Sequence, residues 1–331
     1  MAVDDTAIGP AVTIAAPEHV RPKKAWYHGV LKFIRQKPLG AVGFAMVGIL
    51  FFMTLGTPTG ISQPSLPDAP FGIVMDSPWM ARYEAEDTFY DESGRLRIFE
   101  EPSGDHWLGT DKNGRDVYAR IVEGARRSLW VGIWALIIAT AIGTTIGVVS
   151  GYFGGMADTT SQRFMDALQA FPPLIALILI VTIQPFTNGP SLTLAAFALG
   201  IVGISSVQRI VRGVVLSTKE QQYVEASRVI GATNARTMRY YILPNIMASI
   251  IVVFSTGLGV VILAEAALSF IVPDKMPQGA SWGQMLADTY PVIAVEPWPG
   301  VSAAGAIAIA VLAFNLAGDA LRDVLDPRLR S

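Results

Sequence analysis

The sequence predicts an all-α polytopic membrane protein with six transmembrane helices, and three observations support this fold class. Of the 331 residues, 51% are hydrophobic and only 16% are charged, whereas soluble domains carry about 25% charged residues. Several runs without a charged residue reach the roughly 20 residues that a helix needs to cross a bilayer. Lysines and arginines gather between alternate runs, which is typical of loops on the cytoplasmic side.

The predicted spans are placed on runs without charged residues. The first run is longer than the apolar part of a cleaved signal peptide, and no small-x-small cleavage site follows it, so we expect a retained helix. The run 167–208 is long enough for two spans, and the stretch QPFTNGP (184–190) in its middle contains two prolines and a glycine that favour a turn. In chain order, the predicted spans are 38–57, 128–151, 168–186, 190–208, 245–270 and 298–318.

Basic residues predict the orientation of these spans. The N-terminal arm, the segment 209–239 and the C-terminal tail are rich in lysine and arginine, and with six spans they share one side, which we predict to be cytoplasmic. Four arginines shortly before the second span run against this rule but are outweighed. The loop 271–297 is then extracytoplasmic. The remaining predicted parts are a cytoplasmic arm (1–37), a first transmembrane helix (38–57), an extracytoplasmic loop with a long insertion (58–127), a transmembrane core (128–318) and a cytoplasmic tail (319–331).

A polar segment on the predicted cytoplasmic side reads YVEASRVIGATNARTMRYYILPN (223–245). Ser217 followed by Glu220 fits a capping box at the start of a helix. Gly231 suits the left-handed backbone at a helix C-terminus. A second helical stretch is expected after it, until Pro244 breaks or redirects the chain.

One face of the first of these helices is predominantly apolar, with charges beside it. Such a helix could lie on lipid headgroups or dock onto a soluble partner, and spacing alone leaves both roles open. The apolar stripe consists of Tyr223, Ala226, Val229 and Ile230, and the flanking charges are Glu225 and Arg228.

The same segment resembles the EAA motif of bacterial ABC importer permeases. The matching residues are Glu225-Ala226-Ser227, Gly231 and Ile242-Leu243-Pro244, with Ser227 in place of the second alanine. Three further stretches are similar to one subfamily, the C-type subunits of the dipeptide/oligopeptide importers. They are HWLGTDKNGRDVYARIVEGARRSL (106–129), EAALSF…SWGQML (265–286) and LAFNLAGDALRDVLDPRLR (312–330).

This resemblance implies a type I ABC importer permease fold in a bacterial cytoplasmic membrane. The segment 213–245 would be a coupling loop whose first helix docks on an ATP-binding subunit. The implied partners are a second, B-type permease subunit, two ATP-binding subunits, an extracytoplasmic solute-binding protein and a peptide substrate. ATP and magnesium would be bound by the partner subunits, and no cofactor by this chain.

The residues agree with a chain that is not itself an enzyme. It contains no G-x-x-x-x-G-K-[ST] sequence for phosphate binding, no H-E-x-x-H and no cysteine. The net charge of −2 gives no basic signal for nucleic acid. Alternatives are the same machine with an oligosaccharide or nickel chelate as cargo, a secondary transporter, for which Glu265 is the one intramembrane charge available, and a membrane scaffold or receptor.

The other candidate residues are predicted to lie toward the extracytoplasmic side. The insertion 58–105 is longer than expected for the subfamily, and we expect it to contact the binding protein or the second permease. A short helix is expected at 281–287. An extracytoplasmic structural motif is predicted at Gly109, Thr110, Asp111, Gly114, Arg115 and Asp116. Its charged residues Asp111, Arg115 and Asp116 are expected to form a network that caps the second span, with substrate contact as the alternative. Candidates for a pore or gate are Glu265, Ser269 and Trp282, although a structural hydrogen bond or a water-accessible location is favoured for Glu265.

Two predictions concern helix contacts. Asp166 is expected to pair with Arg163 one helical turn away. The stretches GTTIG (143–147) and GYFGG (151–155) offer small residues for close helix packing, with pore lining as the alternative.

Overall fold

The computed structural model describes residues 35, 37–55, 81–183, 189–277 and 279–325, and this part of the chain is helical apart from turns and isolated β-bridges. Most of the N-terminal arm, residues 56–80 with much of the predicted insertion 58–105, residues 184–188 where a turn was predicted, residue 278 and the last six residues lie outside the described residues. The helices are α2 (Pro38–Leu55), α3 (Val117–Phe153), α4 (Gly155–Gln169), α5 (Pro173–Ile183), α6 (Leu192–Thr218), α7 (Gln222–Val229), α8 (Asn234–Thr237), the π-helical turn η1 (Met238–Ile242), α9 (Leu243–Ile271), the 3₁₀ turn η2 (Pro273–Lys275), α10 (Trp282–Thr289), the 3₁₀ turn η3 (Tyr290–Val292) and α11 (Trp298–Leu325).

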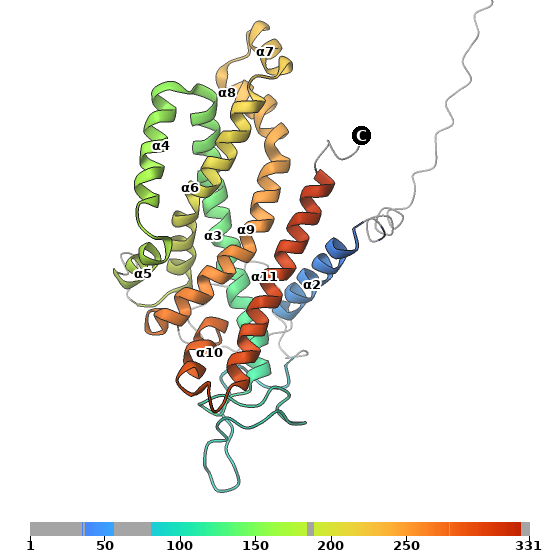
Figure 1. The fold of residues 1–331 in the computed structure, drawn as a ribbon, viewed down its shortest axis with the longest axis vertical. Helices are drawn as coiled ribbons and strands as arrows, with labels where there is room; N and C mark the ends of the chain where they lie inside the picture. Colours follow the sequence, from blue (N-terminus) through green and yellow to red (C-terminus); the bar gives the residue numbers. More distant parts are fainter. Residues whose placement is uncertain (1–34, 36, 56–80, 184–188, 278, 326–331) are drawn as a thin grey trace, which may run out of the picture.

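The long helices run roughly along the length of the molecule (Figure 1). Helix α7 lies at one end, called here the α7 end, and α10 lies at the other, called the α10 end, together with the extended segment 81–116. An ion pair of 2.6 Å between Lys37 and Asp323 joins the start of α2 to the last turn of α11. The segment 209–239, predicted to be cytoplasmic, therefore lies at the opposite end of the molecule from segment 81–116 and α10, which are predicted to be extracytoplasmic.

Four helical stretches in the described part are long and apolar enough to cross a membrane: α3, α6, the continuous stretch Asn234–Ile271, and α11. Helices α4 and α5 pass the same test only as a pair, bent by 79°. Helix α2 is a shorter apolar helix. The second span is part of a longer helix than predicted, because α3 begins at Val117, well before residue 128.

The predicted third span, 168–186, is wrong in its bounds. Pro172 and Pro173 separate α4 from α5, because proline lacks the N–H of the helical ladder and disfavours helical backbone in the residue before it. The polar helix α4 lies beside α6 and is held there by ion pairs. Arg212 contacts Asp158 at 2.6 Å, and Arg209 contacts Asp166 at 2.8 Å. Asp166 thus pairs across to α6, and the predicted local pair with Arg163 is replaced.

Close packing of α3 against α6 depends on small residues, as predicted from the glycine-rich stretches. Gly143, Gly147 and Gly151 face a row of valines on α6 that has the same four-residue spacing. A Cβ atom at Gly147 would lie 2.9 Å from the carbonyl oxygen of Gln208 and 3.0 Å from Cβ of Val211. The two backbones can approach this closely only because the glycines have no side chain.

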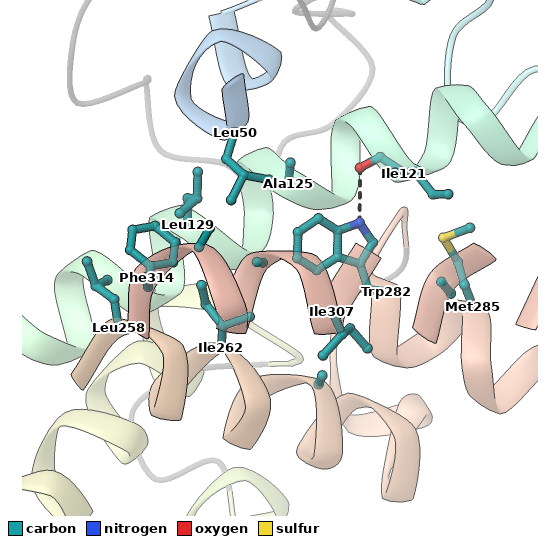
Figure 2. Close-up of a cluster of buried hydrophobic side chains, with 14 of the residues drawn as sticks. Leu50, Ile121, Ala125, Leu129, Leu258, Ile262, Trp282, Met285, Ile307 and Phe314 are labelled. Atoms are coloured by element: carbon teal, nitrogen blue, oxygen red, sulfur yellow. Dashed lines mark hydrogen bonds between the residues drawn. The ribbon is translucent and has the colours of Figure 1, made fainter. Parts of the chain in front are cut away.

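A second core joins α10 to the long helices (Figure 2). The side chain of Trp282 is buried among residues of α3, α9 and α11, and its indole N–H donates a hydrogen bond of 3.0 Å to the carbonyl oxygen of Ile121. Gly283 lies so close to α9 that a Cβ atom there would be 2.2 Å from the carbonyl oxygen of Ala266. Helix α10 overlaps the short helix predicted at 281–287, beginning one residue later and ending at Thr289. It is fixed to the bundle by both shape and hydrogen bonding.

Candidate functional site

The motif segment forms a protruding helical turn at the α7 end (Figure 1). Helix α7 begins at Gln222, with Gln221 as its N-terminal flanking residue. The predicted capping box is wrong, because α6 continues to Thr218 and the hydroxyl of Ser217 donates within that helix to the carbonyl oxygen of Val214. The buried residue Val215 keeps this last part of α6 packed and helical.

The apolar stripe of α7 is exposed on the described surface. Val229 is 82% exposed and Ile230 is 77% exposed, and Tyr223 and Ala226 also face outward. Partial burial of Tyr223 raises the pKa of its phenol, so the hydroxyl stays protonated near neutral pH. The charged residues beside the stripe, Glu225 and Arg228, are exposed as well.

The opposite face of α7 is buried in the chain itself. Val224 belongs to a core with residues of α3, α6 and α9. The hydroxyl of Ser227 donates to the carbonyl oxygen of Val224 and lies 3.4 Å from the hydroxyl of Thr237. Helix α7 is therefore held in place from within, while Val229 and Ile230 on its apolar outer face are largely exposed.

The turn after α7 has the backbone that the sequence predicts. Gly231 has a φ of 83°, in the left-handed region. Its N–H donates to the carbonyl oxygen of Arg228, and the N–H of Ala232 donates to the carbonyl oxygen of Ser227. These two bonds form a Schellman motif, which satisfies carbonyl groups at the helix end. A side chain at Gly231 would strain this turn, although open space surrounds it.

The prediction that Pro244 breaks the chain is wrong. Helical structure is continuous over Asn234–Ile271, and Pro244 lies in the first turn of α9. The π-helical turn η1 precedes it, and the N–H of Leu243 donates to the carbonyl oxygen of Met238, five residues earlier. The wider turn accommodates a residue without an N–H. Ile242 is buried beneath this turn, and Leu243 is partly buried.

A second polar site surrounds Glu265 near the α10 end of α9. Its side chain is 1% exposed. One carboxylate oxygen accepts hydrogen bonds from the hydroxyls of Ser269 (2.8 Å) and Ser281 (3.2 Å), and the other accepts from Ser128 of α3 (2.9 Å). The structural hydrogen bond favoured by the sequence is present. Ser269 and Trp282, proposed with Glu265 as pore or gate residues, are buried in the same region and line no open surface of the described chain.

The start of α3 is organised by the residues of the LGTD-GRD motif. Asp116 caps the helix by accepting a hydrogen bond of 2.7 Å from the N–H of Ala119, and its second oxygen accepts from Nδ1 of the buried His106 at 2.8 Å. Gly109 and Gly114 have positive φ values of 73° and 70°, which shape the turns before the helix. The backbone N–H of Glu100 donates to the hydroxyl of Thr110.

An ion network connects this motif to segments that the sequence did not indicate. Arg115 pairs with Asp111 at 3.0 Å and with Glu86 at 2.7 Å. Glu86 also pairs with Arg120 of α3. Lys112 pairs with Asp288 of α10 at 2.8 Å. No local spacing marks Glu86 or Asp288 as partners, since both are distant in sequence from the basic residues that they contact.

The ion network borders a polar cleft of about 860 Å³ at the α10 end. Its volume is in the range of small-molecule sites. It carries both positive and negative side chains, and most of them are already paired with one another. Its charged lining residues are Glu86, Lys112, Arg115, Arg120, Asp274 and Asp288.

Replacing Asp116 with alanine is expected to lower the free energy of unfolding by about 2–3 kcal/mol. The substitution removes a helix N-cap and leaves the buried imidazole of His106 without its charged partner. Denaturation of the purified chain in detergent measures the change. Asp105→Ala is the control, because this exposed carboxylate makes only a long contact with Arg82, and a change within about 0.5 kcal/mol is expected there. Equal effects of the two substitutions would contradict the capping role.

Four long apolar helices, joined at one end to an exposed short helix, define a membrane protein with several membrane-crossing helices. Residues 143–331, more than half of the chain, match the family described as binding-protein-dependent transport system inner membrane component. The chain belongs to this family, and it is therefore a multi-pass protein of the inner membrane.

Three curated relatives illustrate the similarity. The dipeptide transport system permease protein DppC of Alkalihalophilus pseudofirmus is 40% identical over 73% of this chain and 78% of its own length. The oligopeptide transport system permease protein OppC of Bacillus subtilis is 34% identical over 92% of this chain and 90% of its own length. The glutathione transport system permease protein GsiD of Pectobacterium atrosepticum is 39% identical over 76% of this chain and 81% of its own length.

Proposed function

We propose that this chain is a permease subunit of an ATP-driven importer that moves peptides, delivered by a solute-binding protein, into the cytoplasm. Dipeptides, oligopeptides and glutathione, named for the three relatives, are all peptides. The observation that carries the proposal is the apolar stripe of α7, which is exposed on a helix held rigidly by its other face.

Helix α7 docks in a groove of an ATP-binding subunit. The exposed side chains of Val229 and Ile230 are the apolar anchors of this contact, and Tyr223 and Ala226 extend it along the helix. Glu225 and Arg228 form charge pairs at the rim. Because the ATP-binding subunit is a soluble protein, the α7 end faces the cytoplasm, and both termini are on that side. ATP and magnesium are bound by the partner subunits.

The residues of the motif have separate roles in this contact. Val224 and Ser227 attach α7 to the bundle, and Gly231 ends it in a turn that exposes Ile230 to the partner. Ile242, Leu243 and Pro244 join the docking segment to α9 without interrupting the helix. A movement of α7 driven by ATP binding would thus be passed to a span, and it would shift the population between inward- and outward-facing states.

The α10 end faces outward and meets the other partners. A second, B-type permease subunit completes the path for the peptide, and the solute-binding protein docks over the α10 end. Segment 81–116 exposes apolar side chains there, including Tyr90, Ile98 and Trp107, beside the polar cleft. This mixture of apolar and charged groups suits a transient protein contact.

The docking proposal is tested by Ile230→Asp in the chain purified with its partner subunits. A charge on the central anchor of an interface costs about 2 kcal/mol or more, so recovery of the ATP-binding subunits should fall at least about tenfold. Peptide uptake should fall with it, while membrane insertion of the chain is unchanged, because Ile230 is 77% exposed and belongs to no buried core of the described fold.

The matched control is Val295→Asp, which places the same charge on a residue of similar exposure (78%) before α11, at the other end of the molecule. It should leave recovery of the ATP-binding subunits unchanged. Full recovery with Ile230→Asp would exclude α7 as the docking element.

A further inference from the structure

One aromatic side chain of α3 contacts both helical pieces of the motif segment. Tyr152 lies in the last turn of α3 and is 7% exposed. Its hydroxyl donates a hydrogen bond of 2.9 Å to Oδ1 of Asn234, the first residue of α8. The guanidinium carbon of Arg228, on α7, lies 5.1 Å from the centre of the Tyr152 ring, within the range of a cation–π contact. These contacts lie on the two sides of the turn at Gly231.

The geometry around Tyr152 makes this contact rigid. Its ring is part of the buried core that also contains Val215 of α6, Val224 of α7 and Ile242 at the end of η1. The aromatic side chain is therefore fixed by packing, and its hydroxyl and its face are each directed to a different partner. A tyrosine has few rotatable bonds, so it can transmit a displacement of either partner with little loss.

Helix α3 extends from this contact to the opposite end of the molecule (Figure 1). Its 37 residues correspond to about 55 Å of helix. Along the way it is locked to α6 by the glycine seam, and near its other end Ser128 binds Glu265 of α9. A displacement that enters α3 at Tyr152 therefore reaches two other helices and the network at the α10 end.

We infer that Tyr152 is a positioning residue that couples the movement of the docked α7 to α3. This inference rests on the proposed function, because it presupposes that α7 binds an ATP-binding subunit. Without Tyr152, α7 remains attached to α9 through α8 and η1, but it is no longer tied directly to α3 by these contacts. The ATP-binding subunit then still docks on α7, but the movement of α7 is passed on mainly to α9 and less to α3.

The test measures the distance between α7 and α3 in the complete transporter, purified with its partner subunits. The chain contains no cysteine, so Gln222→Cys on α7 and Val149→Cys on α3, both at exposed positions, accept one spin label each. With Tyr152 present, we expect one narrow distance distribution that is the same without nucleotide and with ATP and vanadate. With Tyr152→Leu, we expect the distribution to shift or broaden when nucleotide is added.

Uptake supplies a second readout in liposomes. With Tyr152→Leu, import of radiolabelled dialanine per ATP hydrolysed should fall about fivefold. Tyr152→Phe should fall between Leu and wild type, since it keeps the ring under Arg228 and loses only the bond to Asn234. If Tyr152→Leu does not fold, Tyr152→Phe and Asn234→Ala carry the test, and each should broaden the distribution.

The matched control is Tyr240→Leu. Tyr240 also has an arginine over its ring, but this residue, Arg239, is its neighbour in the chain, so the contact connects no two helices. The substitution should change neither the distances nor the coupling. A distribution that shifts with nucleotide in wild type, or stays narrow in all Tyr152 variants, overturns the inference. Loss of the ATP-binding subunits from wild-type preparations would instead refute the proposed function, so the two failures are distinguishable.

Discussion

Replacing Gly147 with leucine is expected to prevent the chain from accumulating as a folded protein. The new Cβ atom would meet the carbonyl oxygen of Gln208 at 2.9 Å and Cβ of Val211 at 3.0 Å. Backbone atoms cannot rotate away as a side chain can, so α3 and α6 must separate. Separation also removes the close contacts at Gly143 and Gly151, on the same seam. We expect a loss of about 4 kcal/mol or more, which is a large part of a typical folding free energy.

The measurement is the amount of monodisperse protein after detergent extraction, followed by thermal unfolding of what remains. Gly305→Leu is the matched control, because Gly305 lies within another long apolar helix, α11, and a Cβ atom there would meet nothing within 4 Å. It should give a wild-type yield. A monodisperse Gly147→Leu protein of wild-type thermal stability would show that α3 and α6 can separate without loss of stability. The small residues would then serve the alternative role, pore lining.

The glycine seam also shows which part of the fold is predictable from local sequence. Gly143, Gly147 and Gly151 recur every four residues, so their common face and its use in close packing follow from helix geometry alone. The partner helix does not follow, because the valines of α6 lie some sixty residues later and any long apolar helix could have offered them. Periodicity predicts a packing surface, while the identity of its partner depends on the tertiary arrangement.

Charge patterns located four long apolar helices, at the predicted second, fourth, fifth and sixth spans, but misplaced the third span. A run without charge indicates where a helix can lie in a membrane, and it does not require the helix to be straight or to exclude charged neighbours. Pro172 and Pro173 interrupt the predicted span, and the polar helix before them is accommodated beside α6 through Asp158 and Asp166. Because of these ion pairs, α4 is a helix packed beside α6 in a stretch that the charge pattern had assigned to a loop.

In the candidate site too, features marked by local sequence were predictable, and contacts between distant segments were not. The C-terminal end of α7 and its apolar stripe were predictable, since Gly231 and the stripe are signals within one short segment. The contacts of Tyr152 and Glu86 were not, because each joins residues tens of positions apart whose proximity is a result of folding. The failed capping box at Ser217 has a related cause, since packing of α6 extends that helix past a local stop signal.

Glu265→Leu is expected to loosen the attachment of α10 to the bundle and to lower the free energy of unfolding by about 3 kcal/mol. Leucine fills most of the volume of glutamate, so the loss does not come from a cavity. It comes from the hydroxyls of Ser128, Ser269 and Ser281, which all donate to this carboxylate and would be left buried without that acceptor. Each unsatisfied donor costs about 1–3 kcal/mol, and the serines recover part of this by bonding to carbonyl groups of their own helices.

Hydrogen exchange of the amides in α10 is the most direct measurement, because Ser281 immediately precedes this helix and the bond to Glu265 ties it to α9 and α3. Exchange should accelerate in α10 with Glu265→Leu and stay slow in α6, from which none of the hydroxyls bonded to Glu265 comes. Glu265→Gln is the matched control, since the amide retains an acceptor oxygen and offers an N–H₂ group to the remaining hydroxyl. It should preserve both protection and transport. A Glu265→Gln protein that keeps α10 protected but loses uptake would contradict the structural role and assign the negative charge to the gate.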